Sequence, residues 1–381
     1  MKVVVALDSF KGSLSSKEAG EAVKRGLLRM DPGTDVELFE VADGGEGTSS
    51  VLLAAAGGKV VECAAVNSIG EPVSAQYSII NSHIPTAAID LAAADGLTLI
   101  SDFKRDVMKS STRGTGMLVK DALRRGIRRF FIGVGGSATC DAGLGMLSEL
   151  GFRFLDEYGN RVEAIPALLH KIKRIDSSDV ADEVKAAQIT LLCDVTNPLS
   201  GKQGSAEIFA PQKGATPEMV VALDNGLVSF GRILESYCGR QIIDRKSSGA
   251  GGGIGASLVA CLNAEMVEGA NFILDFIDID QSIRESELVI TGEGRMDGQT
   301  LCGKLPFRIL ERCLDLNVPL IGLAGAVSEP WKLLDSGFAA VCSIQQSAID
   351  LRDAMLKDVA ERGLSVTAAS ALKLFRTASR R

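Results

Sequence analysis

The residues with the clearest chemical potential directly follow the first apolar run of the chain. The string "DSFKGSLSSKE" (residues 8–18) combines an acid, several hydroxyls, a lysine and a glycine ahead of a helical pattern. Ser15 and Glu18 match a Ser-x-x-Glu capping box, which explains Ser15 as a helix N-cap. Four polar residues have no such explanation: Asp8, Ser9, Lys11 and Ser13. Because open α/β sheets bind ligands at strand carboxyl ends, Lys11 is placed to offset a phosphate or carboxylate charge.

Glycine is concentrated in five further loops. They are "ADGGEGTSS" (42–50), "STRGTG" (111–116), "GVGGSATCDAG" (133–143), "SGAGGGIGAS" (248–257) and "TGEGRMDGQT" (291–300). Each is predicted to lie at or just before a helix start, where backbone N–H groups attract anions and glycine admits a phosphate. One such loop would be explained as a turn, whereas the repetition favours a phosphate-bearing ligand. No Gly-x-x-x-x-Gly-Lys-Ser/Thr string occurs, so a P-loop is excluded.

A dinucleotide-binding motif is a competing interpretation of one of these loops. Gly133, Gly135 and Ala138 fit Gly-x-Gly-x-x-Ala after a strand-like run, and Asp156 follows about twenty residues later. Against it, "SATCDAG" inserts an acid and extra glycines where a helix should begin to pack. The alternative stays open at this point.

Composition restricts the chemistry and the partners. Only two histidines are present, His83 and His170, and neither has a spaced partner for a metal site or a triad, so a general base should be a carboxylate. A net charge of −7 and 5% aromatic residues argue against nucleic acid as a partner. The first apolar run ends at Leu7, and no run approaches a membrane span, so we expect a cytoplasmic protein that does not bind membranes.

The elements that must position these residues alternate between strands and helices. Apolar runs at residues 3–7, 36–41, 288–291, 319–324 and 339–344 are typical of strands buried in parallel sheets, and residues 59–80 predict an antiparallel hairpin. The N-terminal part alone supplies too few strands for a stable sheet. We therefore expect an α/β protein with two lobes: a Rossmann-like parallel-sheet domain from residues 1–60 and 284–381, and an inserted mixed α/β domain from residues 61–283. The expected ligand site is a crevice between them.

Eight strings, in order along the chain, resemble the motif series of the glycerate kinase family of bacterial glyoxylate, glucarate and galactarate utilisation. They are "LDSFKGSLSSKEA", "VADGGEGT", "STRGTGMLVKDAL", "GVGGSATCDAGLGM", "CDVTNPLSG", "FAPQKGA", "GAGGGIGA" and "VITGEGRMDGQTLCGK". The resemblance implies ATP-dependent phosphorylation of D-glycerate, commonly at the 2-hydroxyl, by a protein with a flavodoxin-like lobe and an inserted lobe. Three positions depart from the pattern: Leu7 replaces a usual proline, Cys140 a common asparagine, and "MDGQT" varies two positions. Cys140 is interpreted as a small packing residue.

The resemblance, together with the needs of phosphoryl transfer, assigns roles to the polar residues. The transfer requires Mg²⁺ held by oxygen ligands, cations near the phosphates and a carboxylate that orients the attacking hydroxyl. The acids considered are Asp43, Glu46, Asp141, Asp194, Glu293 and Asp297. Asp194 and Asp297 are the candidate base or magnesium ligands, without a decision between the two roles, and Glu293 is a further metal candidate. Lys11 completes the catalytic set.

The remaining roles concern binding. Candidates for substrate binding are Ser9, Ser13, Asp43, Glu46, Arg113, Asn197 and Arg295. Candidates for binding the nucleotide are Gly135, Gly136, Ser137, Gly252, Gly253 and Lys304. Three alternatives stay open: a 3-phosphoglycerate product, a dinucleotide-dependent oxidoreductase, and a non-catalytic sugar-acid sensor. A homo-oligomeric assembly is also left open.

Overall fold

The computed structural model describes residues 1–378, which form two compact units. Unit 1 contains Met1–Asp43 and Ala270–Arg381, and unit 2 contains Gly44–Gly269. The bounds differ from those expected, residue 60 and residue 284. Helix α2 (Thr48–Ala56) contacts strands of unit 2, and α10 (Gly269–Phe276) and α11 (Ile279–Arg284) pack on the sheet of unit 1. Tertiary packing of these helices therefore sets the bounds.

Unit 1 is built on a five-stranded parallel sheet with the order β13-β12-β11-β1-β2. Its strands are β1 (Lys2–Leu7), β2 (Asp35–Glu40), β11 (Leu288–Met296), β12 (Leu320–Val327) and β13 (Ala340–Ser343). Numbered along the chain, this is the flavodoxin-like order 2-1-3-4-5, with its switch point between β1 and β11. The remaining helices of unit 1 are α1 (Ser16–Met30), α12 (Leu305–Leu316), α13 (Pro330–Asp335), α14 (Leu351–Ala354) and α15 (Lys357–Ala378), with a 3₁₀ turn η5 (Thr300–Cys302).

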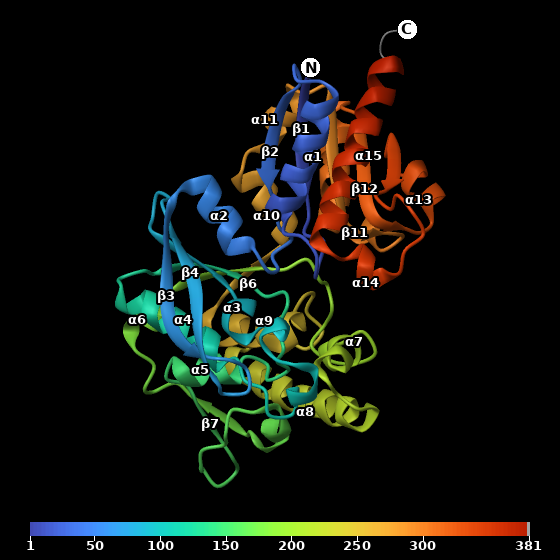
Figure 1. Cartoon of the computed structure of the whole chain (residues 1–381). Coiled ribbons are helices and arrows are strands. Elements are labelled where there is room, and N and C mark those ends of the chain that lie inside the picture. Colours follow the sequence, from blue (N-terminus) through green and yellow to red (C-terminus); the bar gives the residue numbers. More distant parts are fainter. Residues whose placement is uncertain (379–381) are drawn as a thin grey trace. The chain divides into compact units, whose positions relative to one another are not determined.

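Both faces of this sheet are buried, which explains the continuous apolar runs. Val3, Val5 and Leu7 of β1 pack on one face with α1 and α15, and Val4 and Ala6 pack on the other. Alternate side chains of a strand point to opposite faces, so a strand covered on both sides must be apolar throughout. In Figure 1 α15, from the C-terminal end of the chain, lies beside α1 from its beginning.

The local signals at the start of α1 are confirmed. The Ser15 side chain accepts a hydrogen bond from the backbone of Glu18, and the Glu18 side chain accepts one from the backbone of Ser15. This reciprocal pair satisfies two N–H groups that a helix start leaves without partners.

Unit 2 contains a six-stranded mixed sheet with the order β10-β9-β6-β5-β4-β3. Its strands are β3 (Gly58–Val66), β4 (Pro72–Ile80), β5 (Thr86–Asp90), β6 (Arg129–Gly133), β9 (Gln188–Leu192) and β10 (Glu265–Val267). The expected hairpin is β3–β4, which is antiparallel, whereas β5, β6, β9 and β10 are parallel. A separate antiparallel pair joins β7 (Arg153–Leu155) and β8 (Arg174–Asp176).

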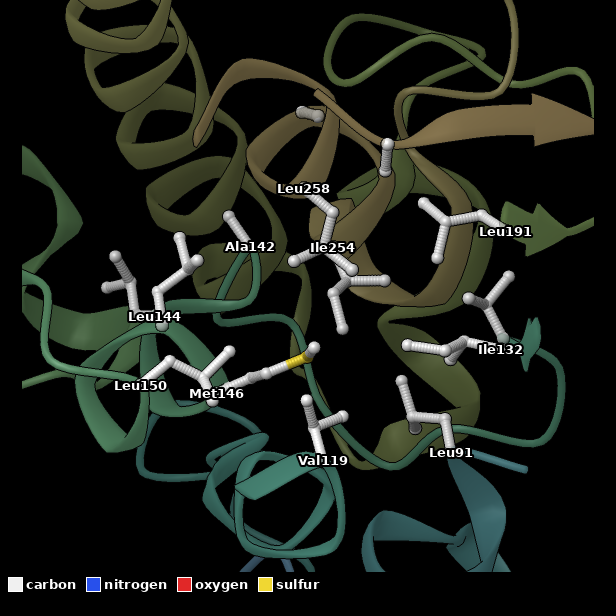
Figure 2. Close-up of a cluster of buried hydrophobic side chains, with 14 of the residues drawn as sticks. Leu91, Val119, Ile132, Ala142, Leu144, Met146, Leu150, Leu191, Ile254 and Leu258 are labelled. Atoms are coloured by element: carbon white, nitrogen blue, oxygen red, sulfur yellow. The ribbon is translucent and has the colours of Figure 1, made fainter. Parts of the chain in front are cut away.

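The helices of unit 2 enclose one apolar core. They are α2, α3 (Ala92–Asp95), α4 (Arg113–Arg124), α5 (Leu144–Glu149), α6 (Asp182–Lys185), α7 (Ser205–Phe209), α8 (Pro217–Cys238) and α9 (Ala250–Leu262). The 3₁₀ turns are η1 (Leu97–Leu99), η2 (Asp102–Lys104), η3 (Pro166–Lys171) and η4 (Pro211–Lys213). Figure 2 shows Ile132 and Leu191 of two strands facing Ile254 and Leu258 of α9, with Met146 of α5 alongside. Among residues 1–378, no helix combines the length and apolar character needed to cross a membrane.

The contact between α1 and α15 gives a test of the packing of unit 1. A Cβ atom added at Gly26 of α1 would lie 2.0 Å from the backbone oxygen of Ser365 in α15. An alanine in a helix normally stabilises it relative to glycine by about 1 kcal/mol. We expect Gly26→Ala to lower the free energy of unfolding instead, by about 1–3 kcal/mol, because the two helices must separate. Urea unfolding followed by circular dichroism measures the change.

Gly33→Ala is the matched control, since the nearest atom to its added Cβ lies 3.5 Å away. A Gly26→Ala protein as stable as the Gly33→Ala protein would contradict the close helix contact.

Candidate functional site

Unit 1 gathers charged side chains at the carboxyl edge of its sheet, next to the switch point. Leu7 of β1 pairs with Gly292 of β11, and the next residues on the two strands are Asp8 and Glu293. The backbone N–H of Asp8 donates to the oxygen of Gly292 at 2.9 Å. Open α/β sheets bind ligands at this position. The sequence drew attention to Asp8 but assigned it no role.

The ionised form of Asp8 is unfavourable in this position. Its side chain is buried, and burial together with repulsion by Asp43 and Glu293 raises its pKa from 3.8 to about 8. The backbone N–H of Ser9, at 2.7 Å from Oδ1, and the charge of Lys11 oppose the rise without cancelling it. A cation that bound beside Asp8 would relieve the repulsion, because opposite charge favours the ionised carboxylate.

The predicted acids of β11 and the loop after it are each held by donors. Glu293 accepts a hydrogen bond from Thr300 at 2.7 Å and forms an ion pair with Lys304 at 3.2 Å, while burial raises its pKa. Asp297 pairs with Arg295 at 3.2 Å and accepts a hydrogen bond from the backbone N–H of Gln299 at 2.9 Å. Arg295 is largely exposed.

The loop after β1 forms a tight turn that carries the candidate lysine. Phe10 and Leu14 exchange backbone hydrogen bonds of 2.8 and 3.0 Å around Gly12, whose φ is +78°. Lys11 is exposed at this turn. Within residues 1–378, the Ser13 hydroxyl is buried without a hydrogen-bond partner.

In unit 2, the loop at residues 44–48 crosses the carboxyl ends of three strands. A Cβ at Gly44 would lie 2.8 Å from the backbone of Leu192 at the end of β9, and one at Gly133, at the end of β6, would lie 2.9 Å from the oxygen of Gly44. Asp90, at the end of β5, accepts hydrogen bonds of 2.9 Å from the backbone N–H groups of Gly47 and Ser49. Glycine and a buried carboxylate therefore hold the "DGGEGT" loop against the sheet.

Glu46 of this loop lines a pocket of about 310 Å³ together with Gln76, Ser78 and Asp90. Burial raises the pKa of Asp90 to about 7, and the charge of Glu46 adds to the rise. The structure thus places Glu46 at a polar hollow. Asp90 was not predicted from the sequence. It follows an apolar strand, and nothing in the local pattern indicates that its carboxylate binds the backbone N–H groups of another loop.

Asp194 lines a second pocket, of about 280 Å³, at the carboxyl ends of β9 and β10. The same pocket is lined by Arg245 and Lys246, and Lys246 is paired with Glu268 at 3.1 Å. Asn197 lies just beyond, where its side-chain amide donates to the backbone oxygen of Gln203 at 2.7 Å and shapes the loop. Arg245 and Lys246 were not predicted from the sequence, because charged residues in a turn are normally exposed to solvent and have no further role.

The glycine loops differ in whether the space beside the glycines is open to a ligand or filled by the protein's own backbone. Gly136 is exposed with φ of +73°, and Ser137 is buried beside it. Gly252 and Gly253 are buried with φ of +77° and +92°, and a Cβ at Gly252 would lie 2.0 Å from the oxygen of Thr139. There the absent side chain makes room for the protein's own backbone.

Four of the five loops lead into a helix start as expected, at α2, α4, α5 and α9. The fifth, residues 291–300, ends at the start of the 3₁₀ turn η5, but residues up to Met296 continue β11 and pair with β12 instead of forming a loop. Gly292 permits this close pairing, since an added Cβ would lie 1.9 Å from the oxygen of Leu323.

Two predicted polar residues have structural partners. Asp141 is fully buried and accepts hydrogen bonds from Thr112, Gly143 and Gly145 at 2.8–3.0 Å, which joins the starts of α4 and α5. Arg113 is exposed and paired with Glu149 at 3.3 Å. Cys140 is fully buried, and burial raises its pKa, so its interpretation as a packing residue is confirmed.

The dinucleotide interpretation is not supported by the geometry. Asp156 is the first residue of an exposed turn, where it accepts hydrogen bonds from the backbone of Tyr158 and Asn160 at 2.9 and 2.8 Å. No helix begins after residue 133 until Leu144, so the glycines do not form the tight strand-to-helix turn of that motif.

Within residues 1–378, no group of three or more His, Cys, Asp or Glu side chains is arranged to hold a metal ion. This donor set still fits Mg²⁺, which proteins commonly bind through one or two carboxylates while substrate phosphates supply the other oxygens. In unit 1, the buried carboxyl of Asp8, which Asp43 and Glu293 repel, favours a cation beside it.

Comparison with known proteins identifies the family. The model of the glycerate kinase family matches residues 3–376. The chain belongs to the glycerate kinase family. A glycerate kinase of Bacillus subtilis (strain 168) is 40% identical over 355 residues, 93% of each chain. A glycerate 2-kinase of Escherichia coli (strain K12) is 38% identical over 355 residues, again 93% of each chain.

A solved structure agrees with this family assignment. The crystal structure of a Salmonella typhimurium LT2 protein, assigned as glycerate kinase 2, is similar with a TM-score of 0.84 at 35% identity and covers 100% of both chains. The expected enzyme class, a kinase that phosphorylates glycerate, and the expected α/β fold are therefore confirmed.

The raised pKa of Asp8 predicts a pH-dependent stability. Between pH 3.8 and about 8, the folded protein keeps a proton on Asp8 that the unfolded chain has lost. The stabilisation of the folded state by this protonated carboxyl is therefore complete below pH 3.8 and is lost as the pH rises to about 8. We expect the free energy of unfolding of the wild type to fall between about pH 6 and about pH 9. In Asp8→Asn this decrease should be smaller by about 1 kcal/mol or more. Urea unfolding at both pH values measures this.

Asp335→Asn, at an exposed acid of unit 1, is the control. Asp90 and Asp95, whose pKa values are also raised, contribute equally in all three proteins. An Asp8→Asn protein that loses as much stability as the wild type over this range would show that the pKa of Asp8 is not raised.

Proposed function

We propose that the protein transfers the γ-phosphoryl group of ATP to the 2-hydroxyl of D-glycerate and releases 2-phospho-D-glycerate. The observation that carries the proposal is the pocket of about 280 Å³ at the carboxyl ends of β9 and β10, where Asp194 is accompanied by Arg245 and Lys246. Its size is near the lower limit of small-molecule sites, about 300–1,000 Å³, which suits a three-carbon acid better than a nucleotide. Family membership supports the same substrate.

Asp194 is the proposed general base. A carboxylate at the end of a strand is held by the sheet, which suits a group that must orient a hydroxyl and accept its proton during transfer. Arg245 has the planar guanidinium that binds a carboxylate through two parallel hydrogen bonds. In this assignment, Asp194 receives the hydroxyl and Arg245 the carboxylate of one small substrate. Glu46 lies at the other pocket of unit 2 as a further group for substrate hydroxyls.

The proposed nucleotide contacts in unit 2 are the backbone amide of Gly136 and the hydroxyl of Ser137, next to Gly135, whose own N–H donates to the oxygen of Gly44 at 3.4 Å. Successive backbone N–H groups in glycine loops form concave sites that bind phosphate oxygens. Gly252 and Gly253 contribute indirectly in this proposal, because Gly252 lets α9 approach the backbone of Thr139 and Gly253 lets it approach Ala142. In unit 1, Lys11 and Lys304 supply positive charge for the phosphates, and Ser13 offers a hydroxyl that has no hydrogen-bond partner within residues 1–378.

The proposed magnesium ligands are carboxylates of unit 1, Glu293 and Asp297, with Asp8 added by the structure. A bound Mg²⁺ would neutralise charge on the transferred phosphoryl group. Glu293 and Asp297 are already oriented by Thr300, Lys304 and the backbone of Gln299. Their directed side chains agree with a role as ligands, and Arg295 then serves to position Asp297.

The proposal predicts that ADP release depends on D-glycerate, ATP and Mg²⁺. We expect Asp194→Asn to lower kcat/KM by about 100-fold or more, because an amide cannot accept the proton. We expect Lys11→Ala to raise the KM for ATP by about tenfold through loss of its charge near phosphate. A coupled ADP assay measures both effects, and phosphorus NMR of the product identifies the phosphorylated hydroxyl.

Asp182→Asn is the matched control for Asp194→Asn, since the side chain of Asp182 is 99% exposed. Equal kcat/KM in the two variants would remove Asp194 from the mechanism. A wild-type protein that binds ATP and glycerate but leaves both unchanged would support the sensor alternative, and 3-phosphoglycerate as the product would overturn the regiochemistry.

A further inference from the structure

A lysine that the motif assignments leave without a role is buried in unit 2. Lys213 is the last residue of η4, and its side chain is only 2% exposed. A buried ammonium group is unfavourable unless it is paired or hydrogen-bonded. Its Nζ donates hydrogen bonds to the hydroxyl of Ser137 at 2.9 Å and to the backbone oxygen of Thr139 at 2.7 Å. Both acceptors belong to the glycine-rich loop at residues 133–143.

The other contacts of this loop leave its centre dependent on Lys213. The oxygen of Gly136 accepts a hydrogen bond from the N–H of Leu97, and the N–H of Ala138 donates to the oxygen of Asp95, at 2.9 and 2.8 Å. These bonds fix the backbone around Ser137 but leave its hydroxyl unrestrained. Lys213 is the donor that orients this hydroxyl.

The charge of Lys213 is not neutralised by a neighbouring acid. Within residues 1–378, no carboxylate forms an ion pair with it, and Asp141, the carboxylate that acts on it electrostatically, already accepts hydrogen bonds from Thr112, Gly143 and Gly145. Burial lowers the pKa of Lys213, as expected when a positive charge lacks a counterion. An anion at the loop would supply the missing negative charge.

We propose that Lys213 is a positioning residue for nucleotide binding, which holds the loop at residues 133–143 from beneath and attracts the phosphates of ATP through it. The inference rests on the proposed kinase function. The adjacent exposed backbone of Gly136 supplies the surface on which phosphate oxygens would be received. Lys213 acts through Ser137 and Thr139, so its effect is on nucleotide affinity rather than on the recognition of glycerate.

Lys213→Met tests this assignment, because methionine fills much of the same space without charge or donors. We expect the Kd and the KM for ATP to rise by about tenfold or more. The KM for D-glycerate and the kcat at saturating ATP should change by less than about threefold. Loss of the buried charge offsets loss of the hydrogen bonds, so the Tm should stay within about 4 °C of the wild type. Lys213→Arg restores charge and donors and should recover part of the affinity.

Lys171→Met, at an exposed lysine of the same unit, is the matched control and should behave as the wild type. Lys213→Gln keeps a donor but removes the charge, so it should raise the Kd for ATP in the same direction, and it carries the test if Lys213→Met does not fold. Unchanged ATP affinity in either variant, or equal losses for ATP and glycerate that follow the Tm, would overturn the inference. A wild-type protein without ATP-dependent turnover would instead overturn the proposed function.

Discussion

Parallel strands end at a common edge of a sheet, and the candidate site depends on this constraint in each unit. In unit 1 it brings Asp8 and Glu293 together at the ends of β1 and β11, although 285 positions separate them in the chain. In unit 2 the ends of β5, β6 and β9 lie under one glycine-rich loop. Loops that share an edge can act on one ligand, whereas the helices mainly cover the faces of the sheets.

Buried charge divides into two kinds at these edges. Asp90 and Asp141 accept hydrogen bonds from backbone N–H groups and thereby fix loops, which is a structural role with satisfied partners. Asp8 and Lys213 are less well compensated: the first faces two other acids, and the second has only neutral acceptors among residues 1–378. Charges that the fold does not neutralise are suited to ligands of opposite charge, a metal ion for Asp8 and phosphate for Lys213.

The sequence predicted the features that depend on local pattern. Continuous apolar runs gave the parallel strands, and the capping box at Ser15 and the hairpin β3–β4 are confirmed. It did not predict that residues up to Met296 stay in β11, because the glycines that look like a loop are needed for close strand pairing. The raised pKa of Asp8 and the burial of Lys213 were also not predicted, because each depends on residues that only the fold brings near. The family motifs located the loops without revealing which residues hold them in place.

We propose that a metal-bound nucleotide relieves the repulsion that Asp43 and Glu293 exert on Asp8. Titration calorimetry with magnesium and ATP in buffers of different ionisation enthalpy counts the protons that binding releases. At about pH 7 we expect release of close to one proton by the wild type, because Asp8 with a pKa of about 8 must ionise, and much less by Asp8→Asn. Tight binding with no proton release from the wild type would contradict it.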